Sequence, residues 1–204
     1  MQSLNPTIDF EAADPFSIFD SWYREAEVCE AIRYAHAMCL STVDLEGRPD
    51  GRMVLLKQYD ERGFVFFTDR NSHKGEQLAE RPSAALTFYW EPLDRQVRIQ
   101  GRAEAASEEE SDACFQRRPR GSQVTAWASN QSHRLESPQD LQERVEQLTE
   151  RFADLKILPR PPRWQAYRVD PRRIEFWQAR SHRLHDRWIF ERQGESWSRH
   201  RLEP

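Results

Sequence analysis

The sequence predicts a mainly β protein with helical insertions, folded as one small β-barrel. Short apolar segments of strand length recur along the chain, and turns such as 44–47 and 60–63, each ending in Gly, separate them. This alternation is typical of an antiparallel meander or barrel. Segments with helical spacing interrupt the strands. The chain of 204 residues has no internal repeat or low-complexity linker, so we expect a short, flexible N-terminal arm (1–14) and a single domain (15–204).

The first half of the chain is expected to begin with a helix. Asp14 can cap it, and Pro15 suits the first helical position. Phe16, Phe19 and Tyr23 then fall on one face at helical spacing. The expected elements of this half are a helix from Pro15, strands over 38–43, 52–57, 64–68, 84–90 and 96–104, and a short helix over 72–80 that ends at Arg81–Pro82.

Two helix caps precede the strands of the second half. Ser107 with Glu110 forms a capping box, and Ser137 before Pro138 opens a longer helix with an apolar stripe. A Pro-rich stretch over 158–162 then leads into the last strands. The expected elements of this half are helices from 107 toward 115 and from 137 to 152, and strands over 164–169, 174–178, 187–191 and 197–201.

Composition restricts the class of protein. The net charge of −4 argues against a strongly basic nucleic-acid binder, and no stretch approaches the roughly 18 apolar residues that span a bilayer. The three cysteines (Cys29, Cys39 and Cys114) form no CxxC motif, and residues 1–14 do not resemble a signal peptide, so we expect a reduced, cytoplasmic protein. The hydrophobic fraction of 38% is low, which is compatible with a core completed by a partner subunit.

Phosphate binding, if present, must depend on side chains. The seven glycines form neither a GxGxxG motif nor a Walker loop, so Rossmann and P-loop nucleotide binding are unexpected. Three segments offer suitable donors: Arg52–Lys57, where the two charged ends of a strand point to opposite faces; Ser72–Lys74 at a helix start; and Arg117–Ser122 around a Pro-Gly turn. The structural alternatives are solvated strand ends, an ordinary surface helix start, and a basic cluster neutralised by Glu108–Glu110.

A fourth cluster combines a strand ending in Trp177 with the dense basic run Arg183–Arg187. Trp beside Arg is a common way to flank a planar ring. A metal site at His182 and His185 is not expected, because no carboxylate or Cys at suitable spacing completes it. A Ser-His-Asp hydrolase lacks its GxSxG elbow.

Taken in order, these segments resemble the pyridoxamine 5′-phosphate oxidase family from about Pro15 to Pro204. The residues that carry the resemblance are Arg52–Lys57, Ser72-x-Lys74-Gly75, Arg95–Val97, Arg118-Pro119-Arg120-x-Ser122-Gln123, Gln131–Ser132, Glu175–Gln178 and Arg183–Arg187.

The resemblance implies a homodimeric split β-barrel with FMN at the subunit interface. It implies oxidation of pyridoxine or pyridoxamine 5′-phosphate to pyridoxal 5′-phosphate, with O2 as acceptor and release of H2O2. The implied FMN contacts are Arg52, Met53, Val54, Leu55, Leu56, Lys57, Phe67, Thr68, His73, Lys74, Gln96, Gln131, Ser132, Trp177 and Arg187. The implied substrate contacts are Lys57, Cys114, Arg118, Ser122, Arg183, Leu184 and His185, of which Arg183 and His185 are the catalytic candidates.

The same resemblance suggests roles for some of these side chains. Arg52 and Lys74 would hold the flavin phosphate, and Gln96 would hydrogen-bond to the flavin ring system. Lys57, Arg118 and Ser122 would surround the substrate phosphate. Arg183 would clamp the substrate from its open side. His185 would either orient the substrate oxygen or take part in proton transfer, and the sequence leaves both roles open.

The chain departs from the family pattern mainly on the substrate side. Cys114 stands where the family usually has a Tyr, and His73 where an Arg often lies. Trp164-Gln165-Ala166 replaces a Trp-Gly-Gly sequence, and the arm lacks basic residues. Two alternatives therefore stay open: an FMN split-barrel oxidase acting on another planar substrate, as in phenazine biosynthesis, or a non-catalytic carrier of FMN or pyridoxal phosphate.

Overall fold

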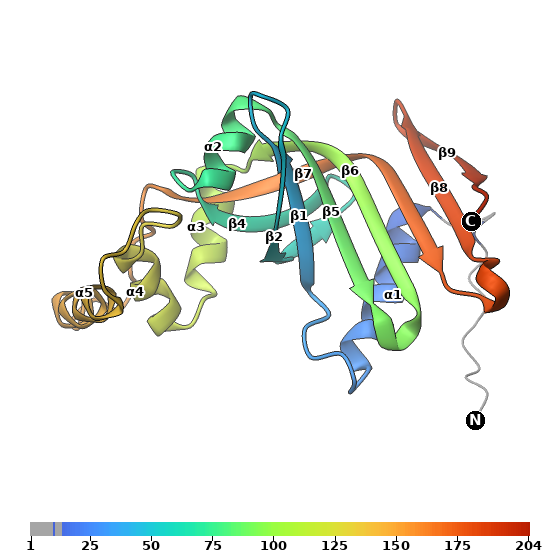
Figure 1. Cartoon of the computed structure of the whole chain (residues 1–204). Coiled ribbons are helices and arrows are strands. Elements are labelled where there is room, and N and C mark those ends of the chain that lie inside the picture. Colours follow the sequence, from blue (N-terminus) through green and yellow to red (C-terminus); the bar gives the residue numbers. More distant parts are fainter. Residues whose placement is uncertain (1–9, 11–13) are drawn as a thin grey trace.

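Nine antiparallel strands form one strongly curved sheet in the part of the chain that the structure describes, residue 10 and residues 14–204 of a computed structural model (Figure 1). The sheet order is β2-β1-β5-β6-β7-β4-β3, and β8 and β9 extend it from the far half of β7. The strands are β1 (Ala37–Val43), β2 (Pro49–Leu55), β3 (Gln58–Asp60), β4 (Gly63–Asp69), β5 (Ser83–Trp90), β6 (Arg95–Ala105), β7 (Trp164–Gln178), β8 (Asp186–Gln193) and β9 (Ser196–Arg201).

Five α-helices accompany this sheet in the described residues. Helix α1 begins where the sequence predicts, because the Asp14 carboxylate accepts hydrogen bonds from the backbone N–H groups of Phe16 and Ser17. The predicted caps at Ser107 and Ser137 are also confirmed, and Ser72 caps α2. The helices are α1 (Pro15–Val28), α2 (His73–Glu80), α3 (Glu108–Gln116), α4 (Arg120–Ala128) and α5 (Pro138–Arg151), with 3-10 turns at Glu91–Leu93 and Ser181–Arg183.

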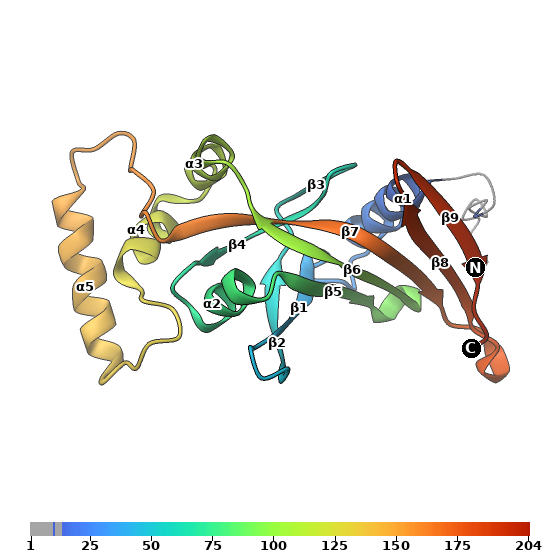
Figure 2. The same cartoon turned by 90° about the horizontal axis from the view of Figure 1, so that it is seen from above.

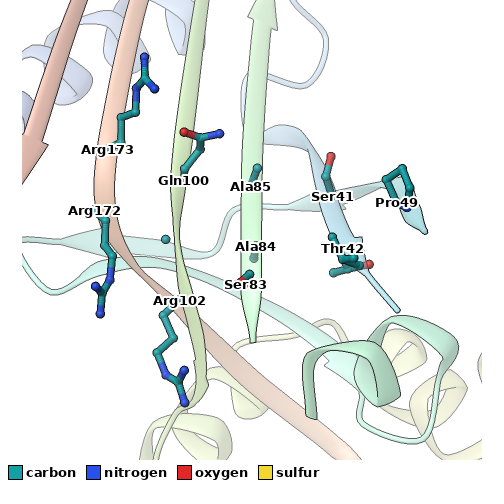
Figure 3. Close-up of a pocket in the computed structure, with 12 residues that line it drawn as sticks. Ser41, Thr42, Pro49, Ser83, Ala84, Ala85, Gln100, Arg102, Arg172 and Arg173 are labelled. Carbon is teal, nitrogen blue, oxygen red and sulfur yellow. The ribbon is translucent and has the colours of Figure 1, made fainter. Parts of the chain in front are cut away.

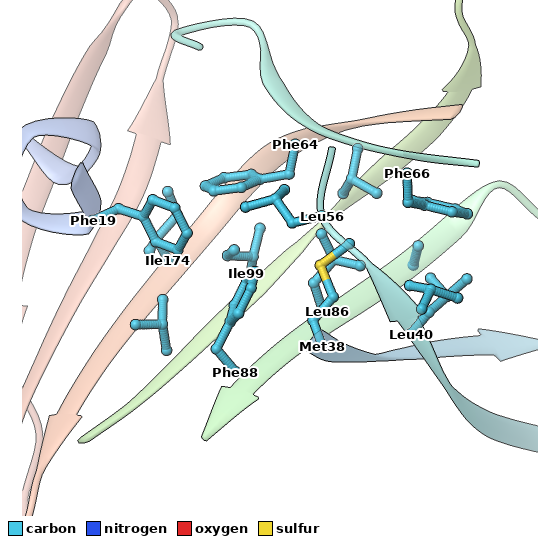
Figure 4. Close-up of a cluster of buried hydrophobic side chains, with 14 of the residues drawn as sticks. Phe19, Met38, Leu40, Leu56, Phe64, Phe66, Leu86, Phe88, Ile99 and Ile174 are labelled. Atoms are coloured by element: carbon cyan, nitrogen blue, oxygen red, sulfur yellow. The ribbon is translucent and has the colours of Figure 1, made fainter. Parts of the chain in front are cut away.

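The main core lies on the inner side of the curved sheet, where α1 packs (Figure 4). Alternate residues of each strand point into it, as in Leu86 and Phe88 of β5, which are fully buried. Phe19 of α1 contacts Phe64 and Phe88 edge-on, with ring centroids 4.9 and 5.3 Å away. None of the helices in the described ranges is both long and apolar enough to cross a bilayer.

Two features differ from the expected element order. The segments 164–169 and 174–178 belong to one strand, β7, because a β-bulge between Gln100 and Gly101 accommodates the Asp170–Pro171 step. Gly101 is needed there, since a Cβ atom at this position would lie 2.0 Å from the Asp170 carbonyl oxygen. The expected Pro-Gly turn near 117–122 is instead the start of helix α4.

The helices α2 to α5 gather at one end of β7, and β8 and β9 lie at the other end (Figure 2). The expected arm 1–14 falls outside the described residues except for Phe10 and Asp14. Phe10 packs its ring against Trp188 of β8, with centroids 5.5 Å apart.

A cation-lined cavity and a distant aromatic row

A cavity of about 520 Å³ lies between the edge of the sheet and the helical end of the molecule. Strands β2 and β4, the N-terminal end of β7 and helices α2 to α4 contribute to it. Its lining residues are Met53, Val54, Leu55, Lys57, Phe67, Thr68, Lys74, Cys114, Arg117, Arg118, Pro119, Ser122, Gln131 and Trp164. Eleven of the residues expected to contact cofactor or substrate therefore share one cavity.

The charges of this cavity suit an anion. Four of its lining residues are cationic (Lys57, Lys74, Arg117 and Arg118), and no Asp or Glu is among the residues that line it. Nη1 of Arg118 is buried and has no hydrogen-bond partner among the described residues. A buried guanidinium N–H without an acceptor is unfavourable, so a ligand with acceptor oxygens fits this wall. The residues present therefore fit a phosphorylated cofactor and a phosphorylated substrate.

Lys74 belongs to one cationic group in the cavity wall. Its Nζ lies 3.2 Å from Thr68 Oγ1, 3.4 Å from Ser72 Oγ and 3.3 Å from Gln131 Oε1. Burial, and then the nearby Arg52, lower the pKa of Lys74. Ser72 caps α2 by accepting from the backbone N–H of Gly75, so the positive end of the helix dipole adds to the lysine charge. This group favours an anion, as the sequence predicts.

Arg52 lies beside Lys74 and is held by buried partners. Its Nη1 donates to Thr42 Oγ1 (2.6 Å) and to the Leu40 carbonyl (3.3 Å), and its Nη2 donates to Gln77 Oε1 (3.2 Å). Thr42 also donates to Gln77 over 2.5 Å, and both of these side chains are buried. The guanidinium is therefore positioned by the protein itself, without a ligand.

Lys57 and Arg118 form a second cationic group in the cavity wall. The Arg118 guanidinium lies 4.0 Å from the centre of the Trp164 ring, and this indole stacks on Phe67 at 4.7 Å with an interplanar angle of 13°. Partial burial and the charge of Arg118 lower the pKa of Lys57, and Cys114 acts in the opposite direction. Cys114 thus lies close to both cations.

The hypothesis that Glu108–Glu110 neutralise the basic segment is wrong. Glu108 pairs with Arg160, and Glu110 pairs with Arg168 at 2.9 Å and with Arg62 at 3.3 Å. Arg117 and Arg118 of the basic segment instead line the cavity.

Of the other expected residues, Leu56 is buried in the main core, and His73 begins helix α2. A further group lies on the outer face of the sheet at its other end. Gln96, Trp177 and Arg187 are direct cross-strand neighbours on β6, β7 and β8, so their side chains share one face. The buried Glu175 carboxylate binds Arg187 at 2.7 and 2.8 Å and Arg98 at 3.0 Å. Glu175 therefore holds the Arg187 guanidinium in place beside Trp177.

The basic run after β7 lies beside this row. The ring of His185 is 4.7 Å from that of Trp177, and its Nδ1 accepts a hydrogen bond from the backbone N–H of Arg180. Arg183 has a positive φ of 62°, and the side chains of Arg183 and Leu184 are both exposed. His182 and Arg183 both adopt left-handed backbone angles, which is uncommon for non-Gly residues and often marks a functional segment.

A single chain does not bring the cavity residues and the residues around Trp177 together. Trp164 lines the cavity and Trp177 lies 13 residues further along the same strand, which corresponds to roughly 40 Å at about 3.3 Å per residue (Figure 2). None of the three cross-strand neighbours Gln96, Trp177 and Arg187 lines the cavity. A single flavin can touch both groups only if a second copy of the chain supplies one of them.

A second cavity, of about 680 Å³, lies over β1, β5, β6 and β7 and contains none of the expected residues (Figure 3). Arg172 and Arg173 line it, but their side chains point in different directions. Among the described residues, no group of three or more His, Cys, Asp and Glu side chains is placed to hold a metal ion.

The half-barrel sheet and its capping helices define a split β-barrel protein whose cavity suits a phosphorylated ligand. Residues 25–178 match the family described as pyridoxamine 5′-phosphate oxidase, and residues 164–204 match the pyridoxine 5′-phosphate oxidase C-terminal dimerisation region. The chain belongs to the pyridoxamine 5′-phosphate oxidase family.

Relatives and solved structures agree with this assignment. The chain is 50% identical to the pyridoxine/pyridoxamine 5′-phosphate oxidase of Rubrobacter xylanophilus over 94% of its length and 87% of the relative's. It is 50% identical to the enzyme of the same name from Burkholderia lata, over 95% and 90%. The crystal structure of PhzG from Burkholderia lata 383 with tetrahydrophenazine-1-carboxylic acid superposes with a TM-score of 0.90 at 33% identity, covering all of this chain and 99% of that one.

Several residues of the site were not anticipated from the sequence. Trp164 is the platform for Arg118, and Thr42 with Gln77 holds Arg52. Sequence offers no direct signal for Thr42 or Gln77, because each looks like an ordinary strand or helix residue. For Trp164, the signal was a large aromatic at the start of an apolar strand, which is equally typical of a core residue.

Proposed function

We propose that this protein is an FMN-dependent oxidase that converts pyridoxamine or pyridoxine 5′-phosphate to pyridoxal 5′-phosphate, with O2 as the final acceptor and release of H2O2. The observation that carries the proposal is one cavity whose wall holds two cationic groups: Lys74, which has Arg52 beside it, and Lys57 with Arg118. Two groups of this kind suit two phosphates, one from the cofactor and one from the substrate. The family match supports the flavin.

In this proposal Lys74, Thr68 and Gln131 hold the cofactor within the cavity, and Arg52 neutralises its phosphate. FMN, when bound, supplies the two-electron acceptor for the oxidation. Lys57, Arg118 and Ser122 bind the substrate phosphate, so that binding energy remote from the reacting carbon keeps the ring in register. The substrate carbon would lose a hydride to the flavin, and its oxygen or nitrogen would lose a proton. With the amine substrate, water would then hydrolyse the resulting substrate imine to the aldehyde and release ammonia.

The partner subunit is proposed to complete each site. Gln96, Trp177 and Arg187 of one copy would then face the flavin held in the cavity of the other, and Arg183 and His185 would cover the substrate. The match of residues 164–204 to a dimerisation region supports this arrangement, because these residues form β7, β8 and β9. Arg183 would clamp the substrate, and His185 would orient its oxygen or accept its proton.

A second candidate is an oxidase acting on a phenazine-type substrate, which the likeness to PhzG favours. The two candidates differ at Lys57 and Arg118, because only the vitamin B6 substrates carry a phosphate. The third, a carrier of FMN or pyridoxal phosphate, would bind ligand without turnover.

A substrate panel tests the proposal. The FMN-loaded protein is assayed for H2O2 release with pyridoxine 5′-phosphate, pyridoxamine 5′-phosphate, unphosphorylated pyridoxine and a reduced phenazine carboxylate. We expect the protein to oxidise both phosphorylated substrates. Its kcat/KM for pyridoxine should be at least a hundredfold lower than for pyridoxine 5′-phosphate. Arg118→Ala should remove most of this preference, whereas the exposed surface variant Arg134→Ala should keep it. Turnover of the phenazine alone would contradict the proposal and establish the second candidate.

A further inference from the structure

The carboxylate of Asp50 lies against the residues expected to hold the cofactor phosphate. It pairs with the Arg52 guanidinium two residues along β2, and its Oδ2 lies 3.4 Å from Nδ1 of His73 at the start of α2. It also acts on Lys74: burial and Arg52 lower the pKa of that lysine, while Asp69 and Asp50 oppose them. One carboxylate therefore faces three of the expected cofactor contacts, including both of the residues expected to hold the phosphate.

Asp50 differs from the other carboxylate near Lys74. Asp69 is almost fully buried, pairs with Arg163 at 3.0 Å and accepts from the backbone N–H of Asn71, so it belongs to the fixed framework. The Asp50 side chain is 40% exposed and contacts the Arg52 guanidinium and the His73 ring. Asp50 therefore pairs with a cation that a phosphate needs, while keeping access to solvent.

Arg52 does not depend on Asp50 for its position. Thr42, Gln77 and the Leu40 carbonyl hold the guanidinium from the buried side. Removal of the Asp50 charge should therefore leave the cation in place and free of a competing anion. A carboxylate and a phosphate at the same guanidinium repel each other, and this repulsion is strong where burial limits screening.

We propose that Asp50 is an internal competitor for the cofactor phosphate and thereby limits the affinity of the protein for FMN. The inference rests on the proposed function, because it takes the phosphate at Arg52 and Lys74 to be that of FMN. Binding of FMN requires that Asp50 leave Arg52 for solvent or remain beside the phosphate at an electrostatic cost. Affinity for a flavin without phosphate is independent of Asp50.

The test is an equilibrium titration of the apoprotein with FMN and with riboflavin, followed by quenching of flavin fluorescence. The variants are Asp50→Asn, which keeps the shape and removes the charge, and Asp50→Ser, which also removes the bulk. The matched control is Glu46→Gln on the same β1–β2 hairpin, where a carboxylate also pairs with an arginine, Arg48. Thermal unfolding of each apoprotein checks that the fold is retained.

We expect both Asp50 variants to bind FMN about tenfold more tightly than the parent protein, with riboflavin affinity unchanged and Glu46→Gln without effect. FMN affinity that is unchanged or weaker in the Asp50 variants, in a parent protein that prefers FMN over riboflavin, would overturn the inference alone. A parent protein that binds FMN no better than riboflavin would overturn the phosphate site, and with it both the inference and this part of the proposed function.

Discussion

The guanidinium carbon of Arg118 lies 4.0 Å from the centre of the Trp164 ring, although 46 residues separate the two along the chain. Phe67 stacks on the same indole, with ring centroids 4.7 Å apart. Because a guanidinium this close to an aromatic ring makes a cation–π contact, Trp164 positions Arg118 in the cavity wall.

This stack predicts the effect of Trp164→Leu. The variant removes the platform, so Arg118 should lose its fixed orientation and KM for pyridoxine 5′-phosphate should rise about tenfold, while FMN stays bound. Trp164→Phe keeps an aromatic face and should restore most of the affinity. Steady-state kinetics and the flavin absorbance per protein measure the two effects. Equal KM values for the Leu variant and the parent would contradict the platform role.

The lowered pKa of Lys57 predicts an alkaline limit on substrate capture. Partial burial and Arg118 disfavour its charged form, so Lys57 loses its proton at a lower pH than an ordinary lysine does. Only the cation attracts phosphate, and kcat/KM of the FMN-saturated enzyme should therefore fall with rising pH below the ordinary lysine range. In Lys57→Arg the cation persists, and the alkaline limb should move to higher pH. If the alkaline limb of the Lys57→Arg profile stays at the same pH, a group other than Lys57 causes the decline in kcat/KM.

Cys114 predicts a gain of function. Its side chain lines the cavity beside Lys57 and Arg118, and a thiol is a weak hydrogen-bond donor. Cys114→Tyr would add a phenol that can donate to the substrate phosphate, which at about 1 kcal/mol corresponds to roughly a fivefold lower KM. Cys114→Phe supplies the same ring without the hydroxyl and serves as the control. If both variants change KM equally, the hydrogen bond has no part in the effect.

The separation of the two residue groups predicts complementation between inactive variants. Arg118→Ala removes a cavity residue, and Arg183→Ala removes a residue at the far end of the chain. If the partner completes each site, a mixed dimer of these variants holds one intact site, so subunits exchanged at equal amounts should regain about a quarter of the parent activity. Absence of any recovery after exchange, verified by differently tagged subunits, would place both residues in one subunit's site.

Much of the fold follows from local signals. Helix α1 begins at Pro15 because Asp14 caps it, and β5 lies where its apolar sequence predicts a strand. Helix α4 was missed for a physical reason. No side chain caps its start at Pro119, so packing of Val124 and Trp127 against α5 and β7 rather than a local signal stabilises it.

The candidate site was predicted less completely than the fold. Residue types and order point to Lys57, Lys74 and Arg118, but long-range packing decides which of them meet. The replacement at Gln165 illustrates this point, because its buried amide donates to Ala106 and Ser111, which lie 59 and 54 residues earlier. No local pattern encodes such contacts.

The measurement that tests the central claim most directly is an anaerobic titration of the FMN-loaded protein with pyridoxine 5′-phosphate, followed by flavin absorbance. Our account predicts stoichiometric bleaching of the oxidised flavin band, formation of an equal amount of pyridoxal 5′-phosphate, and recovery of the band with release of H2O2 when air is admitted. An unchanged oxidised spectrum in a protein that holds FMN would contradict the account.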